Sequence, residues 1–151
     1  MRLYLAAPLF SQVQRTWNRS FAQALESLSP GTTVRLPQDF RAEGRYNDPK
    51  HYPVIFRRCL EALAEADAVV AVLDGADVDA GVAFEIGRAH ALGKPVVGIR
   101  TDYRPGAEQG VNLMVARACR YMVREPAFSE DVRLLARDTL RRLRRSHSVV
   151  S

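Results

Sequence analysis

Four acidic residues gather where a predicted strand gives way to a predicted helix. Asp74, Asp77 and Asp79 follow the apolar run 68–73, and Glu85 lies within the helix that comes next. Glu85 shares the apolar stripe of that helix, which is expected to pack on a sheet, and an unpaired carboxylate is costly there. A charge kept at such a position indicates that the carboxylate has a task.

Three interpretations account for acids in this arrangement, and the residues alone leave all three open. In the first, Asp79 caps the helix and Glu85 pairs with Arg88 one turn on. A magnesium site is the second, but Asp67 lies at the start of its strand rather than at the end, and no partner lysine is evident. The third is carbohydrate chemistry, in which a desolvated carboxylate attacks an anomeric carbon while a second group binds the sugar.

The segments that commonly bind phosphate are missing from the sequence. It contains no Gly-x-Gly-x-x-Gly, no Walker loop, and no serine or cysteine elbow. The turn after the first strand, residues 6–10, reads AAPLF and is small and apolar, so it is a poor phosphate cradle. A neutral ligand fits this turn better.

Size and composition predict one globular domain spanning residues 1–151, with 47% hydrophobic and 26% charged residues. No apolar run approaches the roughly 20 residues of a membrane span, and the N-terminus lacks a signal-like apolar segment. We therefore expect a cytoplasmic protein without membrane contact. Cys59 and Cys119 are too few for a metal cluster or a disulfide framework, so no metal is expected.

The formal net charge of +5 is concentrated in the last predicted helix, where six arginines accompany Asp138. An apolar stripe in that helix leaves the arginines on a solvated face. We interpret this face as ordinary surface or a subunit contact, with a polyanion site as the alternative, and expect no specific binding of nucleic acid.

Strand and helix patterns alternate along the chain. Strands are predicted at 2–6, 33–36, 67–73, 96–99 and 120–123, and helices at 11–28, 53–66, 79–92 and a last segment that includes 132–143. Polar loops are expected at 38–48 and 101–110. This alternation predicts an α/β protein with a five-stranded parallel sheet and helices on both faces, whose ligands bind at the carboxyl ends of the strands.

At this point the sequence resembles the nucleoside 2-deoxyribosyltransferase family. The matching segments cover nearly the whole chain in order. They are LYLAAPLF at 3–10, ADAVVAVLDG at 66–75, DAGVAFEIGRA at 79–89, GKP at 93–95 and VNLM at 111–114. The spacing Asp-x-Gly-x-x-x-Glu, with both of its flanks, is the most specific part of the match.

The resemblance implies a flavodoxin-like three-layer sandwich that exchanges nucleobases on 2'-deoxyribonucleosides by double displacement, without a metal or an organic cofactor. Glu85 would be the nucleophile that forms a covalent deoxyribosyl intermediate, and Tyr4 would hold it. Asn112 would be supplied by a neighbouring subunit of a homo-oligomer. Asp79 would accept a hydrogen bond from the sugar 5'-hydroxyl. Relatives that hydrolyse nucleoside 5'-monophosphates carry a serine at that position, so free nucleosides and free nucleobases are the expected partners.

Cys59 departs from the family pattern, which usually places an aspartate there to assist the departing base. The apolar stripe around Cys59 predicts a small buried core residue instead. Help for the base must then come from Asp39 or Glu43 in the first polar loop or from Asp74, and nothing in the sequence selects among them.

Several weaker candidates complete the predicted site. Phe10 at the first turn is either a base-stacking or a packing residue, and Gly81 and Met114 lie within the matching segments. Arg100, Asp102 and Arg104 are interpreted either as the pocket rim or as a solvated loop. Two alternatives to the transferase remain: an N-glycosidase in which water replaces the acceptor base, and a noncatalytic nucleotide-sensing module.

Overall fold

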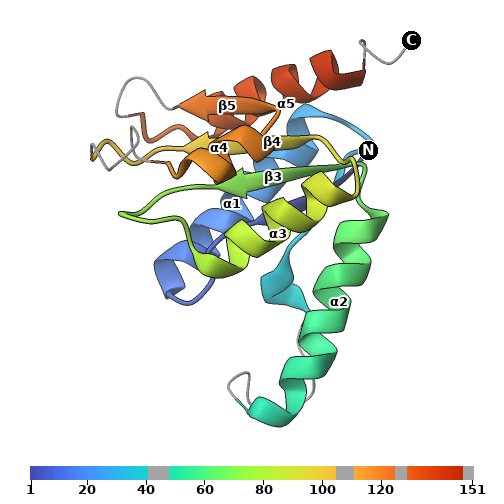
Figure 1. Cartoon of the computed structure of the whole chain (residues 1–151). Coiled ribbons are helices and arrows are strands. Elements are labelled where there is room, and N and C mark those ends of the chain that lie inside the picture. Colours follow the sequence, from blue (N-terminus) through green and yellow to red (C-terminus); the bar gives the residue numbers. More distant parts are fainter. Residues whose placement is uncertain (41–47, 105–110, 125–128, 148–151) are drawn as a thin grey trace.

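A computed structural model of the chain, which describes residues 1–40, 48–104, 111–124 and 129–147, places five parallel strands in one sheet (Figure 1). The strands are β1 (Arg2–Ala6), β2 (Thr33–Arg35), β3 (Ala68–Val72), β4 (Val96–Arg100) and β5 (Tyr121–Arg124). Their order across the sheet is β2-β1-β3-β4-β5. The direction of strand addition reverses between β1 and β3, and doubly wound folds bind ligands outside the carboxyl ends of the strands at such a point.

Helices cover both faces of the sheet. They are α1 (Gln12–Leu28), α2 (Tyr52–Glu65), α3 (Ala80–Ala91), α4 (Leu113–Ala118) and α5 (Val132–His147), with short 3-10 turns at Pro37–Asp39 and Pro49–His51. Helices α1 and α5 pack on one face, and α2, α3 and α4 pack on the other. The three-layer α/β architecture predicted from the sequence is confirmed.

The alternation of side chains along β1 divides the core in two. Leu3 and Leu5 point to the α1–α5 face, whereas Tyr4 and Ala6 point to the α2–α3 face. Strand β3 is buried along its whole length, as its unbroken apolar run predicts. The register between β1 and β3 pairs Tyr4 with Val69 and so brings Tyr4 into the middle of the sheet.

The structure has one short α-helix that the sequence prediction lacks. Helix α4 was not expected, because its six residues are too few to establish a helical period. The predicted polar loops are described only in part: residues 41–47 of the first and 105–110 of the second lie outside the described residues. Within the described ranges, no helix has the length and apolar character needed to cross a bilayer.

Candidate active site

Tyr4 and Glu85 form a direct pair at the boundary between β1 and α3. The Tyr4 side chain is fully buried, and its hydroxyl donates a hydrogen bond to Glu85 Oε1 over 2.5 Å. The two residues are far apart in the sequence. They meet because Tyr4 points from β1 towards the α2–α3 face of the sheet and Glu85 lies on the stripe of α3 that packs there. The structure therefore brings together the two residues for which the resemblance implied contact.

Helix α3 presents Glu85 to the sheet because its neighbours on the stripe are apolar. Val82, Ile86 and Ala89 are buried, and the Asp79 side chain caps the helix by accepting a hydrogen bond from the Val82 amide over 3.1 Å. The interpretation in which Asp79 caps the helix and Glu85 pairs with Arg88 is thus right for Asp79 only. In the described part of the chain, Arg88 forms no ion pair with Glu85, whose partner is the tyrosine.

Burial raises the pKa of Glu85 from 4.5 to about 7. The Tyr4 hydrogen bond opposes this rise because it favours the ionised carboxylate, while the nearby Asp79 charge adds to it. Burial and the Glu85 charge also raise the pKa of Tyr4, so the tyrosine remains a hydrogen-bond donor. Glu85 is accordingly a weakly solvated carboxyl group that ionises near neutral pH, a perturbation typical of functional sites.

A cavity of about 480 Å³ opens beside this pair. Its walls come from the turn after β1, from α2 and from α3, and almost all of the lining is apolar: Phe10, Tyr52, Ile55, Phe56, Cys59, Leu60, Leu63, Gly81, Phe84 and Glu85. The rings of Phe56 and Phe84 lie 6.0 Å apart. A cavity of this size with flat aromatic walls and one carboxylate suits a ring-shaped, largely uncharged ligand.

Two of the predicted binding residues lie at this cavity. Phe10 and Gly81 are both on its wall. At Gly81 a β-carbon would approach Asp79 Oδ1 to 3.1 Å, so a larger residue would press on the helix cap. The aromatic residues Tyr52, Phe56 and Phe84 were not recognised as site residues from the sequence. The signal available was an aromatic pair four residues apart on α2 and a phenylalanine directly before Glu85.

The sequence predicted that Cys59 is enclosed in the core, but the structure shows that it is not. It is half-buried, lines the cavity and interacts with the Tyr4 hydroxyl. Burial raises the pKa of its thiol, so Cys59 stays protonated at neutral pH. The apolar stripe that predicted burial is real, but on α2 it faces the cavity.

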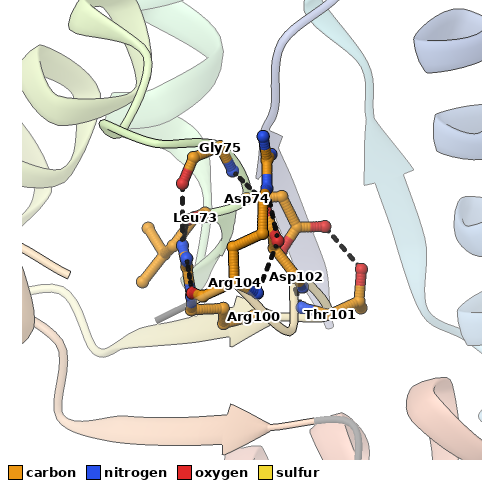
Figure 2. A network of polar contacts seen from close by, with 7 residues as sticks. All are labelled: Leu73, Asp74, Gly75, Arg100, Thr101, Asp102 and Arg104. Carbon is orange, nitrogen blue, oxygen red and sulfur yellow. Dashed lines mark hydrogen bonds and ion pairs between the residues drawn. The ribbon is translucent and has the colours of Figure 1, made fainter. Parts of the chain in front are cut away.

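Asp39 and Asp74, two of the acids proposed to assist the base, are not among the residues that line the cavity. The Asp39 carboxylate pairs with the Arg19 guanidinium, with Nη1 and Oδ2 2.7 Å apart. Both Asp74 oxygens accept hydrogen bonds from the segment after β4 (Figure 2). Glu43 lies outside the described residues.

Arg100, Asp102 and Arg104 belong to that same polar network rather than to a freely solvated loop (Figure 2). The Arg100 side chain is buried and donates to backbone carbonyls, including that of Leu73 over 2.7 Å. Asp102 pairs with Arg104 and accepts from the Gly75 amide over 3.0 Å. The network joins the two loops that follow β3 and β4.

Asn112 and Met114 lie at the start of α4, away from the cavity wall. The Asn112 side chain caps α4 by accepting a hydrogen bond from the Met114 amide over 2.9 Å. Asn112, Leu113 and Met114 are all exposed. Their predicted role in a neighbouring subunit's site stays a prediction.

The sequence predicts no metal site in this protein. Among the described residues, no group of three or more His, Cys, Asp or Glu side chains is arranged to hold a metal ion. The functional groups that line this cavity are a carboxylate, a phenol and a thiol, surrounded by aromatic rings. Together with the doubly wound sheet, they describe an α/β protein with a small-molecule cavity that holds one buried carboxylate of perturbed pKa.

Comparison with known proteins identifies the family. The family model described as nucleoside 2-deoxyribosyltransferase matches residues 3–114. The chain therefore belongs to the nucleoside 2-deoxyribosyltransferase family, whose enzymes are pentosyltransferases that act on deoxynucleosides.

Individual relatives agree with this assignment. A nucleoside deoxyribosyltransferase of Limosilactobacillus fermentum is 29% identical over 77% of this chain and 74% of its own. The crystal structure of a conserved protein from Enterococcus faecalis V583 superposes with a TM-score of 0.77 at 28% identity, covering 94% of this chain and 98% of the other. A 2-deoxyribosyltransferase of Bacillus psychrosaccharolyticus gives a TM-score of 0.69 at 28% identity and covers 90% of each chain.

Proposed function

We propose that this enzyme exchanges nucleobases on 2'-deoxyribonucleosides and that Glu85 is its nucleophile. The observation that supports this most directly is the hydrogen bond from Tyr4 to Glu85 beside an aromatic cavity. A nucleophilic carboxylate must be ionised yet poorly solvated, and must be held in one orientation. Burial makes the carboxylate poorly solvated, whereas the hydrogen bond from Tyr4 favours its ionised form and holds it in one orientation.

The proposed reaction has two displacement steps. In the first, a Glu85 oxygen attacks C1' of the deoxyribose, the N-glycosidic bond breaks, and the base leaves with the bonding electron pair and takes up a proton. In the second, a nitrogen of the incoming base attacks C1', the ester bond to Glu85 breaks, and that base loses its proton. The carboxylate is regenerated, and no proton is gained or lost overall.

Asp79 is proposed to bind the 5'-hydroxyl of the sugar. Its Oδ1 is occupied by the helix cap, which leaves Oδ2 as the acceptor for a hydroxyl proton. A 5'-phosphate would bring a dianion against this carboxylate and would be repelled. Free nucleosides are therefore the proposed substrates, and a large kinetic preference for 5'-monophosphates would contradict this.

A homo-oligomer is proposed to complete the site with Asn112 from a neighbouring subunit. Leu113 and Met114 beside it are 57% and 76% exposed, and Phe10 at the cavity is 72% exposed. Large apolar side chains that are this exposed in a single chain are suited to contact with a second copy. Sedimentation of the purified protein would test this assembly, and a monomer with full activity would exclude it.

Cys59 is proposed to face the departing base. A neutral thiol is a weaker hydrogen-bond donor than a carboxylic acid, and it cannot carry a full charge near Glu85 at neutral pH. Bases that are good leaving groups without protonation should therefore be the better donors.

Incubation with deoxyadenosine and a second free base, followed by chromatography, tests the proposed function. A transferase produces the new nucleoside, an N-glycosidase produces free deoxyribose, and a sensing module produces neither. Glu85→Gln should lower kcat by roughly 10⁴-fold or more, because the amide is not a nucleophile. Intact-protein mass spectrometry of quenched wild-type enzyme should show a covalent deoxyribosyl adduct that Glu85→Gln lacks.

The matched control is Glu65→Gln at the exposed end of α2. It makes the same chemical change away from the cavity and should leave transfer unchanged. Ordinary turnover by Glu85→Gln would exclude the proposed nucleophile, whatever the product.

A further inference from the structure

The loops after β3 and β4 are joined by hydrogen bonds that run in both directions (Figure 2). From the β4 side, Arg100 Nη1 donates to the carbonyls of Leu73 and Gly75 over 2.7 and 3.2 Å. From the β3 side, the Gly75 amide donates to Asp102 Oδ2 over 3.0 Å. Arg100 is only 3% exposed, so these bonds form in a place that water scarcely reaches.

Asp74 is at the centre of this network. Its Oδ1 accepts from the amides of Thr101 and Asp102 over 2.6 and 3.1 Å, and its Oδ2 accepts from the Thr101 hydroxyl over 2.5 Å (Figure 2). Both oxygens are thus engaged by the neighbouring loop. An aspartate used in this way holds backbone in place and is not available to protonate a base.

The loop that Asp74 begins leads directly to Asp79. Gly75 has φ of +119°, and a β-carbon there would lie 2.9 Å from the Asp77 carbonyl oxygen, so the turn is tight and requires glycine. The loop ends at Asp79, which caps α3 and acts electrostatically on Glu85. One end of this short loop is therefore fixed by Asp74, and the other carries the proposed reader of the sugar.

We infer that Asp74 is a positioning residue that fixes the Asp79 carboxylate for the 5'-hydroxyl and thereby sets the enzyme's preference for substrates that carry this hydroxyl. This inference rests on the proposed function. Asp74 acts through its bonds to Thr101 and Asp102, and it contacts neither base nor sugar. A site that hydrogen-bonds a hydroxyl discriminates strongly against analogues without it, but only when the acceptor is held in position.

The test compares 2'-deoxyadenosine with 2',5'-dideoxyadenosine as deoxyribosyl donors for one acceptor base. The ratio of their kcat/KM values measures how well the 5'-hydroxyl is used. In wild-type enzyme this ratio should be on the order of 10⁴ in favour of the hydroxyl, as for a site built to hydrogen-bond a hydroxyl. In Asp74→Asn it should fall by roughly tenfold or more, because the amide keeps one acceptor oxygen but its NH₂ cannot accept from the Thr101 hydroxyl.

Two further variants separate positioning from a general structural effect. Asp77→Asn makes the same change at an exposed residue of the same loop and should keep the wild-type ratio. In an Asp79→Asn background, Asp74→Asn should change the ratio no further, since the acceptor that it positions is already altered. If Asp74→Asn is unfolded at the assay temperature, Thr101→Val, which removes only the hydroxyl donor, should still lower the ratio.

The outcomes distinguish the two proposals. A ratio that stays at the wild-type value in folded Asp74→Asn, with both substrates slowed equally, would overturn the positioning role alone. An equal loss of hydroxyl preference in Asp77→Asn would do the same. A wild-type enzyme that transfers but ignores the 5'-hydroxyl would also overturn it while leaving base exchange intact. No transfer by wild type would remove the proposed function itself, and this inference with it.

Discussion

The two faces of the sheet are built from alternate residues of the same strands, yet they differ in how completely they are closed. On the α1–α5 face, Phe21, Leu25 and Leu143 are fully buried, and the arginines of α5 lie outside them. On the α2–α3 face, a cavity of about 480 Å³ separates the helices, and a carboxylate lies in its wall. The first face has a closed core between its helices and the sheet, whereas the second leaves a cavity between its helices.

Helix α2 shows how the opening arises. Only its C-terminal residues Ala62 and Leu63 are buried, and its N-terminal turns extend beyond the sheet (Figure 1). Tyr52 and Phe56 are therefore 52% and 55% exposed. This face therefore leaves exposed some apolar area that a closed face would bury, at a cost in stability.

Truncating one phenylalanine on each face gives the largest expected contrast in stability. Phe21→Ala should lower the free energy of unfolding by about 3–5 kcal/mol, because it leaves a cavity in a closed core. Phe56→Ala should cost less than about 1 kcal/mol, because over half of its side chain is already exposed. Urea denaturation followed by circular dichroism measures both.

Kinetics on the same two variants should give the opposite order. Phe56→Ala should raise KM through loss of a cavity wall, whereas folded Phe21→Ala should keep the wild-type KM. Equal destabilisation by the two substitutions would show that the α2–α3 face is as closed as its counterpart and would remove the contrast.

Tyr4→Phe should have the next largest effect, confined to the open face. Loss of the hydroxyl leaves Glu85 unoriented, and kcat should fall roughly tenfold to a hundredfold. The same hydrogen bond lowers the pKa of Glu85 against burial, so without it the midpoint of the pH–rate profile should move upward from about 7. A slower enzyme with an unmoved midpoint would show that Tyr4 contributes packing only.

The closed face is the part that the sequence predicts best. The apolar stripe of α5 and the unbroken run of β3 follow from burial alone, and the structure confirms them. The stripe of α1 is buried at Phe21 and Leu25, but Val13 at its start is 78% exposed. On the open face, residues alone identified only the misplaced charge of Glu85, and its tyrosine partner came from family resemblance. Cys59 was misjudged because an apolar stripe looks the same whether it faces a core or a cavity.

The Asp74 network was also beyond the sequence, for a related reason. Its bonds join residues about 27 positions apart, as the Thr101 contact shows, and polar loops carry no period from which a contact could be predicted. Helix α4 was missed because a short element depends on its asparagine cap and its packing more than on any repeat.

The last predicted effect is a gain in stability on removing the nucleophile's charge. Because burial raises the pKa of Glu85 from 4.5 to about 7, the folded protein keeps a proton between these pH values that the unfolded chain has released. The free energy of unfolding therefore falls as pH rises through this window in wild type, and Glu85→Gln lacks this loss. The melting temperature of Glu85→Gln should exceed that of wild type by a margin that grows from pH 4.5 to pH 7 and then levels off, as differential scanning calorimetry would show. Glu65→Gln, at an exposed position, should show no such growth. A margin that shrinks with pH would mean that hydrogen bonds to the Glu85 carboxylate outweigh its burial, and the open face would then not be the one that gives up stability for function.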